Sequence, residues 1–292
     1  MSERYPIIAI TGSSGAGTSS VTRTFQNIFR REGVKAALIE GDSFHKYDRA
    51  EMKQRMQDAE QQGNKNFSHF GPDTNLFGEL ENLFRTYSES GTGQFRHYLH
   101  SPEEAAPFGQ PPGTFTPWES IPDDTDLLFY EGLHGGVVTD KVNIARYPNL
   151  LIGVVPVINL EWIQKLWRDK SQRGYSTEAV TDTILRRMPD YVNYICPQFT
   201  HTHVNFQRVP CVDTSNPFIA REIPAPDESM VVIRFANPKG IDFQYLLSMI
   251  HDSFMSRANT IVVPGGKMEL AMQLIFTPFV LRMMEQRKRA GL

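Results

Sequence analysis

The sequence predicts an α/β domain whose strands are covered by helices on both faces. Three observations support this fold class. Short β-branched runs recur along the chain, and the first four are apolar nearly throughout, as strands buried on both faces are. Amphipathic helical patterns lie between them, the first beginning at Ser19 or Ser20 and ending at Gly33. A glycine-rich segment joins the first strand to this helix, so residues 6–40 form a βαβ unit.

Six strands are expected along the chain. They lie at 6–10, 36–40, 126–131, 150–158, 230–235 and 259–264. The segment from about 90 to 122 is rich in glycine and proline, which favours an ordered excursion or a small hairpin. Because no repeat, low-complexity tract or linker divides the chain, we expect one domain over 1–292. We also expect an inserted region at about 43–122, on the side where a substrate would bind.

Bulk properties exclude several classes of protein. The 292 residues include 30 basic and 33 acidic side chains, so the charge does not favour a nucleic-acid partner. Two cysteines, Cys196 and Cys211, form neither a disulfide framework nor a metal-type spacing. The first residues lack the pattern of a signal peptide, and the apolar run LAMQLIFTPFVL is too short to span a bilayer. We therefore expect a soluble cytoplasmic protein without membrane or nucleic-acid partners.

The segment GSSGAGTSS, residues 12–20, nearly matches the phosphate-binding pattern of Gly, four residues, Gly, Lys and Ser or Thr. Thr18 stands where the pattern has lysine, and Ser19 supplies the hydroxyl that can ligate Mg²⁺. Between a strand and a helix, successive backbone N–H groups can surround phosphate oxygens. The predicted nucleotide-binding residues are Gly12, Ser13, Ser14, Gly15, Ala16, Gly17, Thr18 and Ser19. The alternative is a turn that only caps the helix.

A carboxylate ends the third expected strand. Glu131 lies in DLLFYEGLHGG, at the position where phosphate-loop proteins hold an acid that positions Mg²⁺. The alternative is a solvated carboxylate at a strand end. With the glycine-rich loop present, Glu131 and Ser19 are the predicted metal-site residues.

The segment 159–174, NLEWIQKLWRDKSQRG, predicts an amphipathic lid helix. One face gathers the charged side chains Lys165, Arg168, Asp169 and Arg173. The opposite, packed face is predicted to hold Leu160, Ile163 and Trp167. Phosphoryl transfer needs positive charge around the β- and γ-phosphates, and a lid can supply the cation that the loop lacks. The alternative is a solvated charged face.

The segment IEGDSFHKYDRA follows the second expected strand. Asp42 comes directly after Gly41, where a carboxylate could accept the proton of an attacking hydroxyl. An N-cap of the next helix, by Asp42 or by Ser43, is an equal alternative. His45 and Arg49 follow at helical spacing and suit an anion. Cations here and on the 159–174 helix indicate an acceptor that already carries phosphate.

Nine stretches, in order along nearly the whole chain, resemble bacterial-type phosphoribulokinase. They are GSSGAGTSS, EGDSFHKYDR, FSHFGPD, PGTFTPWE, LLFYEGLHGG, VPVINLEWIQK, RDKSQRGY, NFQRVPCVDTSNPF and VPGGKMELAMQLI. The resemblance implies a P-loop kinase fold, a three-layer α/β sandwich with a mixed, mainly parallel sheet, related to uridine kinase and pantothenate kinase. It implies transfer of the ATP γ-phosphoryl group to O1 of ribulose 5-phosphate, giving ribulose 1,5-bisphosphate. The alternatives are a nucleoside kinase of the uridine kinase type and a non-catalytic ATP-binding regulator.

The resemblance also implies roles for single residues. Asp42 is the catalytic base, Lys165 and Asp169 act in catalysis, and Glu131 or Asp169 supplies the Mg²⁺-site acid. The phosphate-binding set comprises His45, Arg49, His100, Lys165, Arg168 and Arg173. Threonine in place of the loop lysine is shared with the bacterial type, so Thr18 does not indicate a dead enzyme. Cys196 and Cys211 lie far from the loop, in apolar sequence surroundings, so control by a thioredoxin-type disulfide is not expected.

Three arginines lie outside the stretches assigned to substrates: Arg31, Arg234 and Arg257. Local salt bridges at the ends of helices and strands are the alternative explanation. Bacterial-type phosphoribulokinases are octamers activated by NADH and inhibited by AMP. By resemblance these arginines bind the allosteric effector, and a homo-octamer is expected. The histidines of HTH, 201–203, lack a ligand partner for a metal, and His69 and His134 are expected to be either substrate-side or structural.

Overall fold

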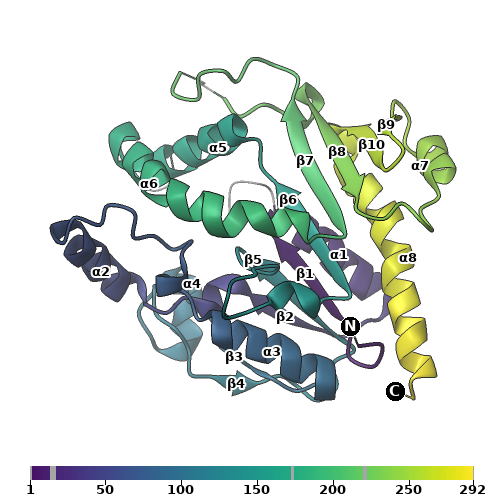
Figure 1. Ribbon diagram of the computed structural model, residues 1–292, viewed down its shortest axis with the longest axis horizontal. Helices are drawn as coiled ribbons and strands as arrows, with labels where there is room; N and C mark the ends of the chain where they lie inside the picture. Colours follow the sequence, from purple (N-terminus) through teal and green to yellow (C-terminus); the bar gives the residue numbers. More distant parts are fainter. Residues whose placement is uncertain (1, 14–17, 172–173, 220–221, 292) are drawn as a thin grey trace.

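The computed structural model describes residues 2–13, 18–171, 174–219 and 222–291. Within these residues, one sheet contains eight strands in the order β2-β5-β1-β6-β7-β8-β10-β9 (Figure 1). Their bounds are β1 Ile7–Thr11, β2 Ala36–Glu40, β5 Leu127–Gly132, β6 Leu150–Val155, β7 Val204–Pro210, β8 Ser229–Phe235, β9 Phe254–Arg257 and β10 Thr260–Pro264. Strands β2, β5, β1, β6 and β7 pair in parallel, and β8, β10 and β9 pair antiparallel. The predicted mixed, mainly parallel sheet is confirmed.

Helices cover both faces of the sheet. Alternate side chains of β1 point to opposite faces, so Ile8 and Ile10 enter one apolar core while Ile7 and Ala9 enter the other. The first core includes helices α1 Thr18–Glu32, α7 Phe243–Met249 and α8 Met268–Arg289. The second includes α3 Phe77–Ser90. Figure 1 shows α1 and α8 together on one side of the sheet and α3 on the other, and the three-layer arrangement follows.

Two features of the sheet differ from the sequence analysis. β2 is an edge strand rather than a fully covered one, and its Leu38 is 45% exposed. β7 and β9 were not predicted, because polar side chains interrupt both sequences, as Asn205, Gln207 and Arg208 do in β7. β7 is nevertheless central, since it joins the parallel half of the sheet to the antiparallel half.

The region at about 43–122 contains both the helix that covers one face of the sheet and several shorter elements. It contains α2 Arg49–Gln61, α3, β3 Gln94–Phe95, α4 Pro102–Ala105 and β4 Glu119–Ser120. The segment at about 90–122, expected as an ordered excursion or a small hairpin, is an ordered excursion that contains α4 and is closed by antiparallel pairing of β3 with β4. Asp48 caps α2 by accepting a hydrogen bond from the Glu51 backbone N–H, and Glu51 reciprocates.

Helices α5 Ile158–Ser171 and α6 Thr177–Asp190 pack side by side (Figure 1). The prediction that Trp167 lies on the buried face of α5 was wrong, because Trp167 is 46% exposed. The buried stripe comprises Leu160, Ile163, Leu166 and Asp169, spaced three residues apart. Leu166 packs with α6, so the second helix selects this stripe and turns Trp167 outward. None of the described helices is long and apolar enough to cross a membrane.

Candidate active site

The carboxyl ends of β2 and β5 come unusually close together. A Cβ atom on Gly41 would lie 2.7 Å from the Cα of Gly132, and both glycines lie against the Tyr130 hydroxyl. Only residues without a Cβ fit here, so Gly41 is required for this close approach. The contact places Asp42 and Glu131, the neighbours of these two glycines, at the same edge of the sheet.

A cavity of about 280 Å³ opens at this edge. The side chains and loop residues that line it include Gly12, Thr18, Asp42, His100, Glu131 and Arg168. They come from five separate parts of the chain: the glycine-rich loop, the segment after β2, the inserted region, β5 and α5. The structure therefore brings the predicted phosphate loop, base, metal-site acid and two phosphate-binding side chains to one space.

The glycine-rich loop begins directly after β1. Gly12 donates a backbone hydrogen bond to Gly132, and the Thr18 hydroxyl donates to Glu131. Burial, opposed by this hydrogen bond, raises the pKa of Glu131. The predicted loop residues Ser14, Gly15, Ala16 and Gly17 lie outside the described residues, as do Arg173 and the side chain of Ser19.

Asp42 lies in a short 3₁₀ helix, Gly41–Phe44, rather than at an N-cap. The alternative that Asp42 or Ser43 caps the next helix was wrong, because Asp48 does so. Asp42 Oδ1 is 3.2 Å from His45 Nε2, and Asp42 Oδ2 is 3.7 Å from His100 Nε2. Burial favours the neutral acid, but the hydrogen bond and charge of His45 and the charge of His100 hold the pKa of Asp42 well below its usual range. The Asp42 carboxylate is thus ionised, and its two oxygens can accept hydrogen bonds.

His45 and Arg49 do not share a helical face, contrary to the sequence analysis. His45 is buried in extended backbone after the 3₁₀ helix and bridges to Asn75. Arg49 is the first residue of α2, is exposed, and donates to the backbone carbonyl of His100 at 2.9 Å. The Asp48 cap between them turns the chain into α2 and separates the two side chains.

The charged residues of α5 form a compact ion cluster. Asp169 is buried, and its carboxylate lies 2.5 Å from Lys165 Nζ and 3.1 Å from Arg168 Nε. Arg168 lines the cavity with Asp42, whereas Lys165 lines the neighbouring space between α5 and α6. Burial, together with the charge of Arg187, lowers the pKa of Lys165 to about 8. Asp169 is therefore engaged by two cations of its own helix.

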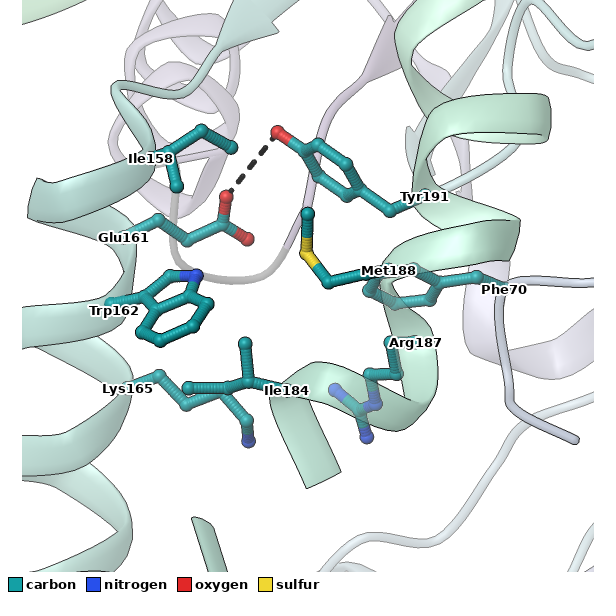
Figure 2. Close-up of a pocket in the computed structure, with 9 residues that line it drawn as sticks. All are labelled: Phe70, Ile158, Glu161, Trp162, Lys165, Ile184, Arg187, Met188 and Tyr191. Carbon is teal, nitrogen blue, oxygen red and sulfur yellow. Dashed lines mark hydrogen bonds between the residues drawn. The ribbon is translucent and has the colours of Figure 1, made fainter. Parts of the chain in front are cut away.

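Two charged residues of this region, Glu161 and Arg187, were not predicted from the sequence. Figure 2 shows Glu161 and Lys165 of α5 facing Arg187 of α6 and Tyr191, the first residue of the π-helical segment Tyr191–Ile195 that follows α6. Arg187 lies 5.1 Å above the Phe70 ring, and its charge acts on Lys165 and Asp169. The sequence did contain an indication that Arg187 faces inward, because it continues the buried stripe of Val180 and Ile184 at helical spacing.

Glu161 connects the glycine-rich loop to α5. One carboxylate oxygen accepts a hydrogen bond from the buried Ser13 hydroxyl, and the other lies 3.5 Å from the Tyr191 hydroxyl. Burial raises the pKa of Glu161, and the bonds from Ser13 and Tyr191 oppose that shift. Glu161 is one helical turn before Lys165, so the contact orients the face of α5 that carries the cation.

The three predicted effector arginines lie far from this cavity in the fold. Arg234 of β8 and Arg257 of β9 both pair with Thr260 of β10, so the two arginines flank Thr260 on one face of the sheet. Neither makes an ion pair with any residue in the described part of the chain, so local salt bridges do not account for them. Arg31 differs, because it pairs with Glu32 at 2.7 Å and donates to Thr277.

Two further histidines and the two cysteines lie outside the cavity. His134 is buried beside the Phe70 carbonyl, and His203 Nδ1 accepts a hydrogen bond from the Leu151 backbone. No group of three metal-ligating side chains occurs among the residues described. Cys211 is exposed, so the expected apolar surroundings were wrong for this residue, whereas Cys196 is partly buried.

Known proteins resemble the chain over its whole length. A model of the Phosphoribulokinase / Uridine kinase family matches residues 7–215. The chain belongs to this family. The chromosomal phosphoribulokinase of Cupriavidus necator is 88% identical over 291 residues, covering 100% of both chains. The phosphoribulokinase of Nitrobacter vulgaris is 70% identical, covering 99% of this chain and 100% of that protein.

A solved phosphoribulokinase has the same fold. The structure from Rhodobacter spheroides has a TM-score of 0.91 and 59% sequence identity, and the match covers 98% of this chain and 100% of that one. The P-loop kinase fold expected from the sequence resemblance is therefore confirmed. Membership of the phosphoribulokinase family also agrees with the glycine-rich loop and the two carboxylates found at one sheet edge.

Proposed function

We infer that this chain is an ATP-dependent sugar-phosphate kinase with phosphoribulokinase activity. It transfers the γ-phosphoryl group of ATP to O1 of ribulose 5-phosphate, giving ADP and ribulose 1,5-bisphosphate, the chemistry of the Calvin cycle. The observation that carries this function is the shared cavity. A phosphate loop, a base and cations line one space, next to an inserted region with further cations.

Each side chain in the cavity has a role in phosphoryl transfer. Asp42 accepts the proton of the attacking hydroxyl, since its carboxylate is ionised and 40% exposed to the site. Arg168 supplies positive charge to the transferring group, and Lys165 joins it by exchanging its bond to Asp169 for phosphate oxygens. The loop backbone from Gly12 to Ser19 binds the β-phosphate.

The oxygen ligands at this edge suit Mg²⁺. The cation prefers one or two carboxylates together with phosphate oxygens and water, and Glu131 is a partly buried carboxylate beside Thr18 at the loop. Glu131 and the Ser19 hydroxyl are the residues that would hold it. When bound, Mg²⁺ neutralises charge on the β- and γ-phosphates.

The phosphate of the acceptor is bound by cations on both sides of Asp42. We assign this role to His45, Arg49, His100, Arg168 and Arg173. Three of them come from the region at about 43–122, which we therefore interpret as a substrate-side insertion in a single kinase domain. Arg168 lies on α5, in the segment predicted as a lid over 159–174, and Arg173 of the same segment lies outside the described residues.

The adenosine end of ATP has a candidate site beside the loop. A second cavity, of about 270 Å³, is lined by Ser20 and Arg23 of α1, by Phe206 and by Met272. It adjoins the first turn of the helix that follows the phosphate loop, and its walls are largely apolar, as purine pockets are. We assign the base and ribose to this cavity.

A direct assay tests the proposed function. The chain is incubated with ATP, Mg²⁺ and either ribulose 5-phosphate or uridine, and ADP release is followed. ADP release with ribulose 5-phosphate is expected. Release only with uridine would support a nucleoside kinase, and no release with either acceptor, despite ATP binding, would support a regulator.

A second proposal concerns regulation by an effector that binds away from the cavity. We assign Arg31, Arg234 and Arg257 to an allosteric site for NADH in a homo-octamer. The arrangement of Arg234 and Arg257 on either side of Thr260 supports this, because two arginines on one face of the sheet, without ion-pair partners in the described chain, suit a phosphate-bearing effector. Binding energy that differs between two quaternary states would couple this site to activity.

A further inference from the structure

His45 lies between two oxygen acceptors next to the candidate active site. Its Nδ1 is 2.8 Å from Oδ1 of Asn75, and its Nε2 is 3.2 Å from Oδ1 of Asp42. Both His45 and Asn75 are buried, so these contacts form away from bulk water. The protonation of the ring must satisfy both partners at once.

The surrounding loop orients the Asn75 amide. Asn75 Nδ2 donates to the backbone carbonyl oxygens of His69 at 2.8 Å and Gly71 at 2.6 Å. A reversed amide would set its oxygen against those two carbonyls, and none of the three atoms can donate a hydrogen bond. Asn75 therefore presents Oδ1 to His45, and this oxygen requires an N–H on Nδ1.

The same requirement applies to the other ring nitrogen. Asp42 is ionised and its carboxylate oxygens only accept hydrogen bonds. A neutral imidazole carries a single N–H, so it would leave one ring lone pair facing an oxygen lone pair. The imidazolium cation donates from both nitrogens and satisfies both acceptors.

We propose that Asn75 is a positioning residue that holds His45 as an imidazolium cation facing Asp42. This inference rests on the proposed function, in which Asp42 is the base and His45 belongs to the acceptor site. Asn75 itself acts only through His45, since its polar contacts are with His45, Thr74 and the loop carbonyls.

The other charges around His45 are consistent with this state. The titratable and charged groups that face it come from several elements and are Asp42, His69, Arg96, His100, His134 and Arg187. Burial lowers the pKa of His45, but the bonds to Asp42 and Asn75 outweigh burial and the charge of Arg187, so the pKa is raised. Burial and the charge of His45 lower the pKa of His69 to about 3. His69 is therefore neutral and does not compete for the positive charge.

The positive charge of His45 should make binding of the sugar phosphate depend on pH. A raised pKa means that the charge on His45 is present below that pKa and is lost as the pH rises through it. Asp42 remains ionised throughout this range, so the base is retained while one cation of the phosphate-binding set disappears. The kcat/KM for the sugar phosphate should therefore fall on the alkaline side.

The test is the pH profile of kcat/KM for ribulose 5-phosphate, from about pH 6 to about pH 9.5, at saturating ATP and Mg²⁺. Saturating nucleotide keeps Lys165 bound to phosphate, so its own titration does not enter. In Asn75→Leu the alkaline limb should move to lower pH by about one unit or more, the worth of a hydrogen bond to a charged group. The matched control is Ser68→Ala, because the buried Ser68 hydroxyl donates to Asp190 and accepts from the Phe70 backbone N–H in the same loop, and its side chain bonds neither Asn75 nor His45. Its limb should coincide with that of wild type.

An unmoved limb in a folded Asn75→Leu enzyme, with activity reduced equally at every pH, overturns the proposal. If Asn75→Leu does not fold, the pH profiles of wild type and His45→Gln are compared instead. The limb must then be present in wild type and absent in His45→Gln, and a limb that persists without His45 overturns the proposal. Failure of the proposed function gives a different result, namely no turnover of ribulose 5-phosphate by wild type. In that case the ¹⁵N shifts of labelled His45, assigned with His45→Gln, still report its charge, and a neutral ring at pH 7 overturns the inference.

Discussion

The Ser13 hydroxyl of the glycine-rich loop donates a hydrogen bond to the Glu161 carboxylate of α5. The two residues are 148 positions apart in sequence, and both are largely removed from solvent. The contact joins the element that binds phosphate to the helix that carries Lys165 and Arg168. It therefore links the position of the loop to the position of the cations.

Removing this contact should reduce turnover. In Glu161→Ala, kcat should fall about 10- to 100-fold, since a buried hydrogen bond to a charged group is worth about 1.5–3 kcal/mol. Glu161→Gln keeps an acceptor for Ser13 and should retain most of the activity. Steady-state kinetics at saturating substrates, with thermal unfolding of each variant, measures the effect. Equal kcat in wild type and Glu161→Ala would exclude the linking role.

Asp42→Asn removes the base but keeps the shape of the side chain. We expect kcat to fall by about 10²–10⁴, the range for a positioned general base, with ATP affinity nearly unchanged. Rapid-quench measurement of phosphoryl transfer separates this effect from product release. A kcat within a few-fold of wild type would show that another group accepts the proton.

The lowered pKa of Lys165 leads us to expect that kcat/KM for ATP falls at alkaline pH. Because burial and Arg187 lower its pKa to about 8, its charge is present below that pH and lost above it. The kcat/KM for ATP reports groups of the free enzyme, so it should decline above about pH 8. Lys165→Arg, which stays charged, should remove this decline, and Lys165→Met should lose most turnover at every pH. A decline that is identical in wild type and Lys165→Arg would assign it to another group.

Arg49→Ala should chiefly raise KM for ribulose 5-phosphate. Loss of a charge-assisted hydrogen bond costs about 1.5–3 kcal/mol, which is about 10- to 100-fold in KM. Arg85→Ala on α3 is a matched control, because it removes an exposed arginine whose partners among the described residues all lie on its own helix. An unchanged sugar-phosphate KM with weaker ATP binding would move Arg49 to the nucleotide site. Arg173→Ala is expected to behave as Arg49→Ala does.

Arg234→Ala should abolish activation by NADH without changing the basal rate. Its side chain is exposed on β8, far from the catalytic cavity, so loss of the guanidinium removes an effector contact only. Activity is measured against NADH concentration at subsaturating ATP, with Arg289→Ala as a control for loss of a surface arginine. If wild type does not respond to NADH, the allosteric assignment fails while the kinase assignment stands.

The local pattern of the sequence was sufficient for the first βαβ unit. The β2 strand was predicted with its observed bounds, and the first helix within one or two residues of its observed start and end. The glycine-rich loop, Asp42 and Glu131 were identified because each lies at or just beyond the carboxyl end of a strand. Parallel strands end at one edge of a sheet, so residues that follow them meet there whatever the rest of the fold does.

The partners of polar side chains depended on packing between distant segments. Helical spacing alone placed Trp167 in the core, but contact with α6 selects Leu166, because two helices bury only the stripe that faces the neighbour. No local pattern pairs Ser13 with Glu161, or His45 with Asn75, 30 residues away. The sequence by itself therefore determined the fold class, the phosphate loop and the two carboxylates at the sheet edge. Only the tertiary structure decided which buried groups hydrogen-bond to them, since that depends on which side chains the packed layers enclose together.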